Sequence, residues 1–395
     1  MRDLAELDIA DGTRVLVRAD LNVPIEGGVI QDELRIDAVL PTLRYLRERG
    51  GVVVVCSHLG RPQGEVVPEL SLAPVAQRLA EKLGTEVRLQ SAVVGPEVEA
   101  AVAALKPGDV TMLENLRFEP GEEADDPAFA EQLARLADVY VNDAFGVSHR
   151  AAASVVGVCA LLPHAPGLLV AAEVKAFERI LVDPPRPFVA ILGGAKVSDK
   201  LGVIDALLDK VDVLLVGGAM AFTFARAEGG SIGASLCEDD RILDVKAAVA
   251  RAAELGKELL LPEDVVCATE IASAAETRVT APTDVPDGWM GLDVGPRTVE
   301  SFAARIASAG SVLWNGPMGV FETPPFDAGT RGVAEAFAST EAFTVAGGGD
   351  SAAALRQMGL AGRIDHLSTG GGASLEYIEA GDLPGLAALR APDPT

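Results

Sequence analysis

Short apolar runs alternate with amphipathic helical patterns along the chain, and this alternation constrains the fold more than any other feature of the sequence. In the first half, the apolar runs predict strands at Arg14–Arg18, Val52–Cys56, Glu86–Leu89, Val110–Leu113 and Val139–Asn142. Helical patterns lie between or beside these runs at Glu33–Arg49, Leu72–Leu83, Gly95–Leu105 and Pro127–Leu136. Strands that alternate with helices are typical of a doubly wound parallel sheet, whose ligands bind beyond the carboxyl ends of the strands.

The second half repeats this pattern, with glycine-rich turns after its apolar runs. These runs predict strands at Phe188–Leu192, Val213–Val216, Leu259–Leu261, Val312–Trp314, Phe343–Ala346 and His366–Ser368. A helical pattern at Gly167–Ile180 and the proline-rich break Asp183–Pro187 separate the two halves. Because 395 residues exceed what one hydrophobic core normally holds, we predict two similar-sized α/β domains. Each is expected to be a mainly parallel sheet flanked by helices, and a hinge would join them.

Basic side chains gather near the predicted strand ends of the first half, although the chain is strongly acidic overall. It has 33 Lys and Arg against 58 Asp and Glu, a net charge of −25 that argues against nucleic acid or an anionic membrane as partner. The basic set is Arg35, His58, Arg61, Arg117 and Arg150. Each member alone could be a surface ion-pair partner or a structural histidine. Together they would repel one another without an anion, so they predict a small, multiply anionic ligand.

Two lysines follow the first strand of the second half and its Gly193-Gly194 turn. The four-residue spacing of Lys196 and Lys200 predicts that both project from one face of a helix near its first turn. A helix amino end is already positive, so two lysines there are unfavourable without an anion. A solvated surface pair is the alternative, but the strand and the glycines favour a polyphosphate site. The sequence lacks the G-x-x-x-x-G-K-[ST] motif of a P-loop enzyme.

Further glycine turns indicate a nucleotide site in the second half. The turns at 217–218, 347–349 and 370–372 would let backbone N–H groups approach phosphate oxygens at helix amino ends. Asp350 follows one of these turns, and two interpretations stay open: a helix cap or a magnesium ligand beside the phosphates. The acidic run from Glu119 to Asp126 is predicted to be a solvated loop.

Cysteine usage and hydropathy predict a cytoplasmic protein. The four cysteines are scattered and form no C-x-x-C pair, which indicates neither a disulfide framework nor a zinc site. The segment Met1–Gly12 lacks the apolar core of a signal peptide. The long apolar segment Val155–Ala172 is interrupted by two prolines, so we predict no membrane span there. We also expect a monomer.

The order of these motifs resembles that of the phosphoglycerate kinase family along nearly the whole chain. The stretches that carry the resemblance are Val17–Pro24, Ser57–Pro62, Glu114–Phe118, Asn142–Gly146, Leu192–Lys200, Gly288–Asp293, Trp314–Glu322, Gly347–Ser351 and Ser368–Ser374. The resemblance implies a glycolytic and gluconeogenic phosphotransferase with a carboxyl acceptor. It would transfer a phosphoryl group in line between 1,3-bisphosphoglycerate and Mg-ADP after domain closure, giving 3-phosphoglycerate and ATP.

The resemblance also implies two sets of site residues. The substrate-binding set is Asp20, Asn22, Arg35, His58, Arg61, Arg117 and Arg150. The nucleotide-binding set is Lys196, Lys200, Gly217, Gly218, Gly291, Leu292, Asn315, Pro317, Val320, Glu322, Gly348, Gly349, Asp350 and Ser351, with Mg²⁺ on Asp350 and the ribose on Glu322. The groups assigned to the transferring phosphoryl are Arg35, Lys196, Lys200 and the backbone N–H groups around Gly349, Gly371 and Gly372.

The implied domains are residues 1–170 for phosphoglycerate, to which residues 380–395 return, and residues 185–379 for the nucleotide. Residues 171–184 would form the hinge helix. Two other interpretations stay open: a kinase for another carboxylate or for a sugar phosphate on the same scaffold, and a non-catalytic protein that closes on an anion. A binding protein would not need the lysine pair and Asp350 on the second domain.

Overall fold

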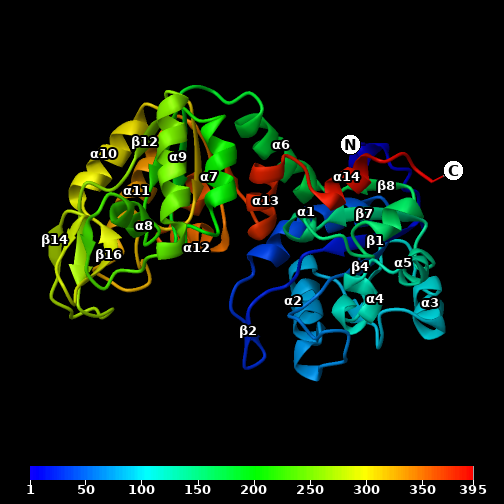
Figure 1. The fold of residues 1–395 in the computed structure, drawn as a ribbon. Helices are drawn as coiled ribbons and strands as arrows, with labels where there is room; N and C mark the ends of the chain where they lie inside the picture. The colour runs from blue at the N-terminus through cyan, green and yellow to red at the C-terminus, as the bar shows by residue number, and fades with distance from the viewer. Residues whose placement is uncertain (395) are drawn as a thin grey trace. The chain divides into compact units, whose positions relative to one another are not determined.

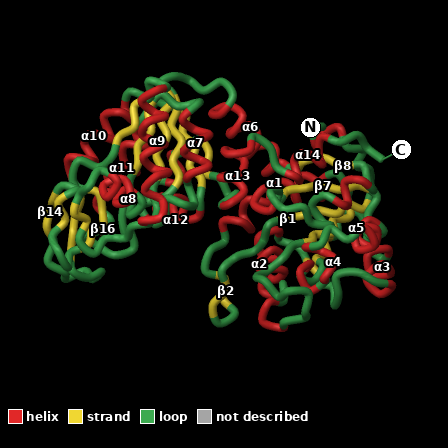
Figure 2. Tube along the Cα trace, viewed as in Figure 1, coloured by secondary structure: helices red, strands yellow, loops and turns green. Residues whose placement is uncertain are grey.

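The computed structural model describes residues 1–394, which form two compact units. Unit 1 contains Met1–Val174 and the segment that begins at Asp382, and unit 2 contains Lys175–Gly381. Each unit has a sheet bounded by helices (Figures 1 and 2). The predicted α/β fold class is therefore confirmed. No helix formed by residues 1–394 is both long and apolar enough to cross a membrane.

Unit 1 is built on a six-stranded parallel sheet. Across the sheet the order is β5 (Val87–Leu89), β6 (Val110–Met112), β4 (Val52–Cys56), β1 (Arg14–Ala19), β7 (Val139–Asp143) and β8 (His164–Pro166). The chain runs outward from β1 to β4 and later returns to the other side of β1 with β7. The connections therefore diverge between β1 and β7, and ligands of doubly wound sheets bind at such a point. Ala19 and Asp143 are paired there.

Helices cover this sheet and leave its central strands without exposed side chains. All five residues of β4 are buried, which is typical of a parallel strand between two layers of helices. The helix α1 buries Ile36, Leu43 and Leu46 in the same core as Val17 and Val55. The helices of unit 1 are α1 (Leu34–Glu48), α2 (Ala73–Leu83), α3 (Pro96–Ala103), α4 (Pro120–Glu123), α5 (Pro127–Ala134) and α14 (Pro384–Arg390), with a hairpin of β2 (Ile25–Glu26) and β3 (Val29–Ile30).

Unit 2 repeats the topology. Its parallel sheet has the order β12 (Glu258–Leu260), β10 (Val213–Val216), β9 (Phe188–Leu192), β17 (Ser311–Asn315), β18 (Phe343–Gly347) and β19 (His366–Leu367). The connections diverge between β9 and β17, so a second ligand site is expected beyond the carboxyl ends of these two strands. The core includes Trp314, whose ring meets that of Phe337 edge-on at 5.5 Å between centroids.

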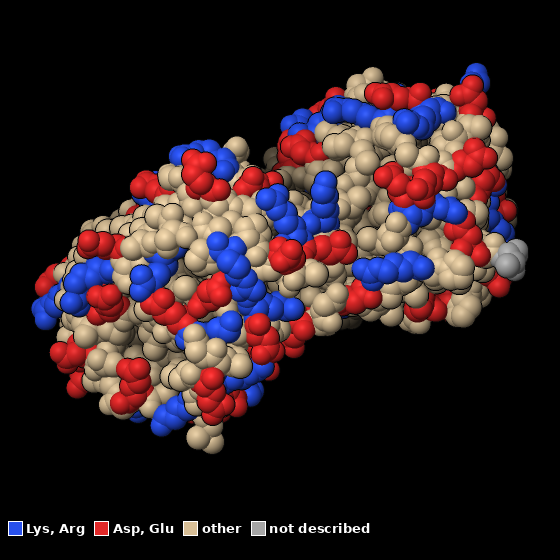
Figure 3. All heavy atoms as spheres, turned by 90° about the horizontal axis from the view of Figure 1, so that it is seen from above, with Lys and Arg blue, Asp and Glu red and all other residues tan. Residues whose placement is uncertain are grey.

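The remaining elements of unit 2 are helices around this sheet and two small sheets. The helices are α7 (Leu201–Leu208), α8 (Ala221–Ala227), α9 (Ile242–Glu254), α10 (Pro296–Ala307), α11 (Ala328–Ser339), α12 (Gly349–Gln357) and α13 (Gly372–Ala380). The small sheets are β14 (Arg278–Thr280), β13 (Val265–Ala268) and β16 (Met290–Val294), and β11 (Ser231–Ile232) with β15 (Asp284–Val285). The helix α6 (Leu168–Leu181) begins in unit 1 and ends in unit 2. Acidic and basic side chains are interspersed over the face drawn in Figure 3.

Two local predictions are wrong, and one of the two open interpretations of Asp350 is excluded. Lys196 does not lie on a helix, because α7 begins only at Leu201 and a turn occupies the residues before it. Asp350 is not the cap of α12: the cap residue is Gly348, and Asp350 lies inside the first turn. The acidic run is not a solvated loop throughout, because Glu122 belongs to α4 and is 2% exposed. Its hydrogen-bonding partner, Ser154, lies 32 residues away in the sequence, where local pattern gives no sign of it.

Candidate active site

In unit 1, the predicted substrate residues begin directly after β1. The Arg35 guanidinium, on the first turn of α1, lies 2.8 Å from Oδ1 of Asp20 and 3.2 Å from the carbonyl oxygen of Asn22. The Asn22 side chain in turn accepts a hydrogen bond of 3.0 Å from the backbone N–H of Gly60, in the loop after β4. The ends of β1 and β4 and the start of α1 are thus joined by polar contacts.

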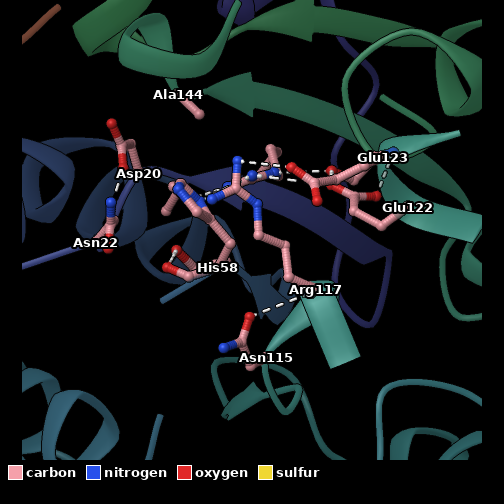
Figure 4. A network of polar contacts seen from close by, with 12 residues as sticks. Asp20, Asn22, His58, Asn115, Arg117, Glu122, Glu123 and Ala144 are labelled. Atoms are coloured by element: carbon pink, nitrogen blue, oxygen red, sulfur yellow. Dashed lines mark hydrogen bonds and ion pairs between the residues drawn. The ribbon is translucent and has the colours of Figure 1, made fainter. Parts of the chain in front are cut away.

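His58 and Arg117 lie deeper in the same network (Figure 4). His58 is 3% exposed, and its Nδ1 atom is 3.2 Å from Nη2 of Arg18. Burial, and then the charges of Arg18, Arg117, Arg35 and Arg150, hold the pKa of His58 well below its usual range, so the ring is neutral near pH 7. Arg117 is also buried and donates a hydrogen bond of 2.7 Å to the carbonyl of Gly60.

The two remaining members of the basic set are exposed. Arg61 makes no hydrogen bond or ion pair with another side chain or backbone group in the described part of the chain. Arg150 is close enough to lower the pKa of both His58 and Arg117. Carboxylates compensate only part of this charge: Asp20 pairs with Arg35, and Glu123 lies 3.2 Å from Arg117. The excess of positive charge suits a small anion with several negative groups.

In unit 2, a polar cavity of about 410 Å³ lies after β9 and β17. Its lining includes the predicted residues Lys196, Lys200, Asn315, Gly348, Gly349, Asp350, Ser351, Gly371 and Gly372. Lys200 is 9% exposed, and its ammonium group donates to Oδ1 of Asn315. Burial lowers the pKa of Lys200 to about 8, partly offset by Asp199 and Asp350. A buried, poorly compensated ammonium is stabilised when a phosphate group approaches it.

Two helices direct their amino ends at this cavity. Gly348 and Gly371 are the cap residues of α12 and α13, with φ angles of 92° and 54°. Other residues rarely adopt such angles, so the sequence needs glycine at both caps. The first N–H groups of each helix have no partner within the helix and carry partial positive charge. Anions bind readily at such helix ends.

An apolar cavity of about 430 Å³ shares Gly194, Ala195 and Asp350 with the polar one. The predicted residues in its lining are Gly218, Gly291, Leu292, Pro317, Val320 and Glu322. At Gly291 an added Cβ would lie 1.9 Å from the Phe222 ring, so glycine keeps this wall flat. Gly217 lines neither cavity, because it packs on the sulfur of Met318, which an added Cβ would meet at 2.5 Å. An apolar slot beside a cationic, N–H-rich pocket fits the base and the phosphates of a nucleotide.

Comparisons with known proteins agree with this geometry. Residues 4–381 match the family model described as phosphoglycerate kinase. The phosphoglycerate kinase of Thermus thermophilus is 54% identical over 392 residues, covering 99% of this chain and 100% of its own, and that of Moorella thermoacetica is 53% identical over 390 residues, covering 98% and 99%. The solved structure of phosphoglycerate kinase from Coxiella burnetii superposes with a TM-score of 0.88 at 41% identity, covering 98% of each chain.

The chain belongs to the phosphoglycerate kinase family. Its reaction is therefore the exchange of a phosphoryl group between 1,3-bisphosphoglycerate and ADP, with ATP and ADP as co-substrates. The resemblance seen in the sequence and the enzyme class that it implied are both confirmed. The alternative of a non-catalytic anion-binding protein falls away.

Several buried residues that support the basic set were not predicted from the sequence. Arg18 is 2% exposed in the middle of the sheet, and Glu122 and Ser154 are buried beside it. Asn115 is also buried, and its Oδ1 accepts hydrogen bonds from the backbone N–H groups of Leu59 and Arg117, so it joins the two loops that carry His58 and Arg117. The one available signal was an arginine within an apolar strand, which is costly unless it is paired.

Proposed function

We propose that the basic set of unit 1 holds the phosphoglycerate and that the two cavities of unit 2 hold the nucleotide. The observation that carries this assignment is the joint placement of Lys196, Lys200 and two glycine-capped helix ends around one cavity. A nucleotide polyphosphate needs such a set of donors, whereas a three-carbon acid with one phosphate needs a compact group of arginines. The apolar slot beside Glu322 would take the base and the sugar.

Asp350 is our candidate for the Mg²⁺ ligand. It lines the polar cavity with both lysines, and magnesium sites of nucleotide enzymes use one or two carboxylates together with phosphate oxygens. No group of three or more His, Cys, Asp or Glu residues able to hold a metal occurs among residues 1–394. The other ligands would therefore come from the nucleotide and water. When bound, the ion would neutralise charge on the phosphate oxygens.

The protein groups would align the reactants and stabilise charge on the transferring phosphoryl group. Arg35, Lys196 and Lys200 would contact its oxygens from two sides. The N–H groups of Gly349, Gly371 and Gly372 would donate to the same oxygens at the amino ends of α12 and α13. No general base is needed, because the attacking carboxylate oxygen of 3-phosphoglycerate is already an anion.

Because the two ligands are assigned to different domains, the reaction would require domain closure. Residues 1–170, with 380–395, would bind phosphoglycerate, residues 185–379 would bind the nucleotide, and a hinge at 171–184 would let the ligands meet in a water-excluded site. We further propose a cytoplasmic monomer without nucleic-acid or membrane partners. The net charge of −25 supports the absence of polyanionic partners.

The test of this function is ATP consumption with 3-phosphoglycerate, coupled to removal of the 1,3-bisphosphoglycerate formed. We expect turnover that requires both the acceptor and magnesium, and a control with excess chelator should be inactive. A panel of other carboxylates and sugar phosphates tests acceptor choice. Faster turnover with any of them, or equal turnover without magnesium, would contradict the assignment.

A further inference from the structure

A buried polar network lies directly beneath His58 in unit 1. Nε of Arg18 donates a hydrogen bond of 2.8 Å to Oγ of Ser154, and that hydroxyl donates one of 2.6 Å to Oε1 of Glu122. The other carboxylate oxygen of Glu122 accepts a bond of 3.0 Å from the backbone N–H of Ser154. All three side chains are buried, and Figure 4 shows Glu122 and His58 within the same set of polar contacts.

This network presents one guanidinium N–H to the imidazole ring. Nη2 of Arg18 lies 3.2 Å from Nδ1 of His58 and 3.9 Å from Oε1 of Glu122. A guanidinium group has donors and no acceptor, and it does not lose its proton in proteins. Nδ1 must therefore accept, so the neutral ring carries its proton on Nε2. Residues 1–394 provide no hydrogen-bond partner for that Nε2 atom.

The second buried histidine of unit 1 shows the opposite arrangement. Nδ1 of His164 lies 2.9 Å from the carbonyl oxygen of Leu162, which can only accept, so His164 carries its proton on Nδ1. The two rings therefore differ in tautomer because their Nδ1 partners differ. This difference makes His164 an internal reference for any measurement on His58.

We propose that Arg18 is a positioning residue for the acceptor substrate: held by Glu122 and Ser154, it fixes His58 as the Nε2–H tautomer, which donates to the anionic phosphoglycerate. The proposal rests on the assignment of the basic set to phosphoglycerate. A ring with its proton on Nδ1 would turn a lone pair toward the anion instead, which would repel it. Arg18 itself need not touch the substrate.

The direct test is ¹⁵N NMR of the full-length enzyme with labelled histidine, using long-range couplings within each ring. His58→Gln and His164→Gln would assign the two signals. For His58 we expect a protonated Nε2 and an unprotonated Nδ1 at pH 7.5, and for His164 the reverse. A His58 ring with a proton on Nδ1, or on both nitrogens, would overturn the proposal without any variant of Arg18.

Steady-state kinetics of three variants test whether the His58 tautomer matters for the binding of 3-phosphoglycerate. We expect Arg18→Met to mix the His58 tautomers and to raise the KM for 3-phosphoglycerate about tenfold or more, the loss typical of one hydrogen bond to a charged group. The KM for ATP should stay within about twofold. Arg18→Met leaves the carboxylate of Glu122 unpaired, which threatens folding. Ser154→Ala therefore serves as a second variant: it removes the hydroxyl that links Arg18 to Glu122 but keeps both charges. Thr111→Val, which removes another buried hydroxyl of unit 1, is the matched control and should leave tautomer and KM unchanged.

The outcomes distinguish the effect of Arg18 on the His58 ring from the effect of the ring on substrate binding. An unchanged His58 tautomer in both Arg18→Met and Ser154→Ala would refute the role of Arg18. A changed tautomer with an unchanged KM for 3-phosphoglycerate would refute the donation by His58. Failure of the wild-type enzyme to turn over 3-phosphoglycerate would contradict the proposed function instead, while the tautomer measurement would still decide what Arg18 does to the ring.

Discussion

Several arginines of unit 1 gather around His58, although the net charge of the chain is −25. Four arginines are near enough to His58 to lower its pKa. Among residues 1–394, three carboxylates, those of Asp20, Glu122 and Glu123, form ion pairs with this group. Bringing these cations together without full compensation costs stability, and an anionic substrate bound there, as we propose, would remove that cost. Such a cost is common at functional sites.

Arg35 gives the simplest prediction at this scale. We expect Arg35→Ala to lower turnover by about 100-fold or more, because it removes one donor that would stabilise charge on the transferring phosphoryl. The fold should persist, since the side chain is 30% exposed and its ion pair is with Asp20. Steady-state kinetics would measure the loss. Arg44→Ala on the same helix, an exposed arginine bonded to the carbonyl of Lys82, should keep wild-type turnover; comparable rates for both variants would remove Arg35 from the mechanism.

His58 gives a second prediction, on pH. Its pKa is depressed in the folded state, so the unfolded chain takes up a proton below about pH 6.5 that the folded chain does not. Unit 1 should therefore lose stability as the pH falls through 6.5. Between pH 7.5 and 5.5 this loss should be larger in the wild type than in His58→Gln, by at most about 1.4 kcal/mol. Protection of the β1 amides against hydrogen exchange would measure it, and identical losses would show that His58 protonates freely.

At the scale of elements, the amino end of α6 is held from within unit 1. Oδ1 of Asp143, at the end of β7, accepts hydrogen bonds from the backbone N–H groups of Leu169 (2.9 Å) and Val170 (3.3 Å). Thr42 on α1 accepts a third, of 3.0 Å, from Leu168. Burial raises the pKa of Asp143 to about 7, although these N–H groups favour its charged form. The strand that ends beside the proposed substrate residues thus also fixes the start of the helix that leaves unit 1.

Removing this contact should loosen the helix. We expect Asp143→Ala to destabilise the first turn of α6 by about 2 kcal/mol, because buried N–H groups lose their partner and water does not replace it. Asp126→Ala at the exposed amino end of α5, where water can replace the carboxylate, should cost about 1 kcal/mol or less. The loss of hydrogen-exchange protection of the first-turn amides, in α6 for Asp143→Ala and in α5 for Asp126→Ala, measures both effects. Equal losses would mean that Asp143 adds nothing beyond an ordinary cap.

Elements were more predictable from the sequence than the contacts between them. Apart from β8, to which no strand was assigned, the strands of both parallel sheets were found within about two residues, because apolar runs and glycine turns are local signals. The cavity residues of unit 2 follow strand ends in the same way. The Arg18–Ser154–Glu122 network was missed because its members come from three separate stretches of the sequence. The position of Lys196 was missed because four-residue spacing fits a turn and a helix equally well.

For the whole molecule, the prediction concerns the distance between the two units in solution. Because phosphoglycerate and nucleotide are assigned to different units, transfer requires that they approach. We expect small-angle scattering to give a smaller radius of gyration with 3-phosphoglycerate and Mg-ATP together than with either ligand alone. Arg35→Ala with both ligands serves as a comparison with weakened closure. A radius that does not change with any ligand would contradict domain closure.

The helix α14 has a consequence for how the protein is made. It packs on β8 within unit 1, burying Leu386 and Leu389, and the backbone N–H of Gly385 donates to the carbonyl of Ser148. A ribosome delivers all of Lys175–Gly381 before this helix. Unit 2 can thus finish folding during synthesis while unit 1, which starts first, still lacks part of its core. The acceptor site would then be the last part of the nascent enzyme to become rigid.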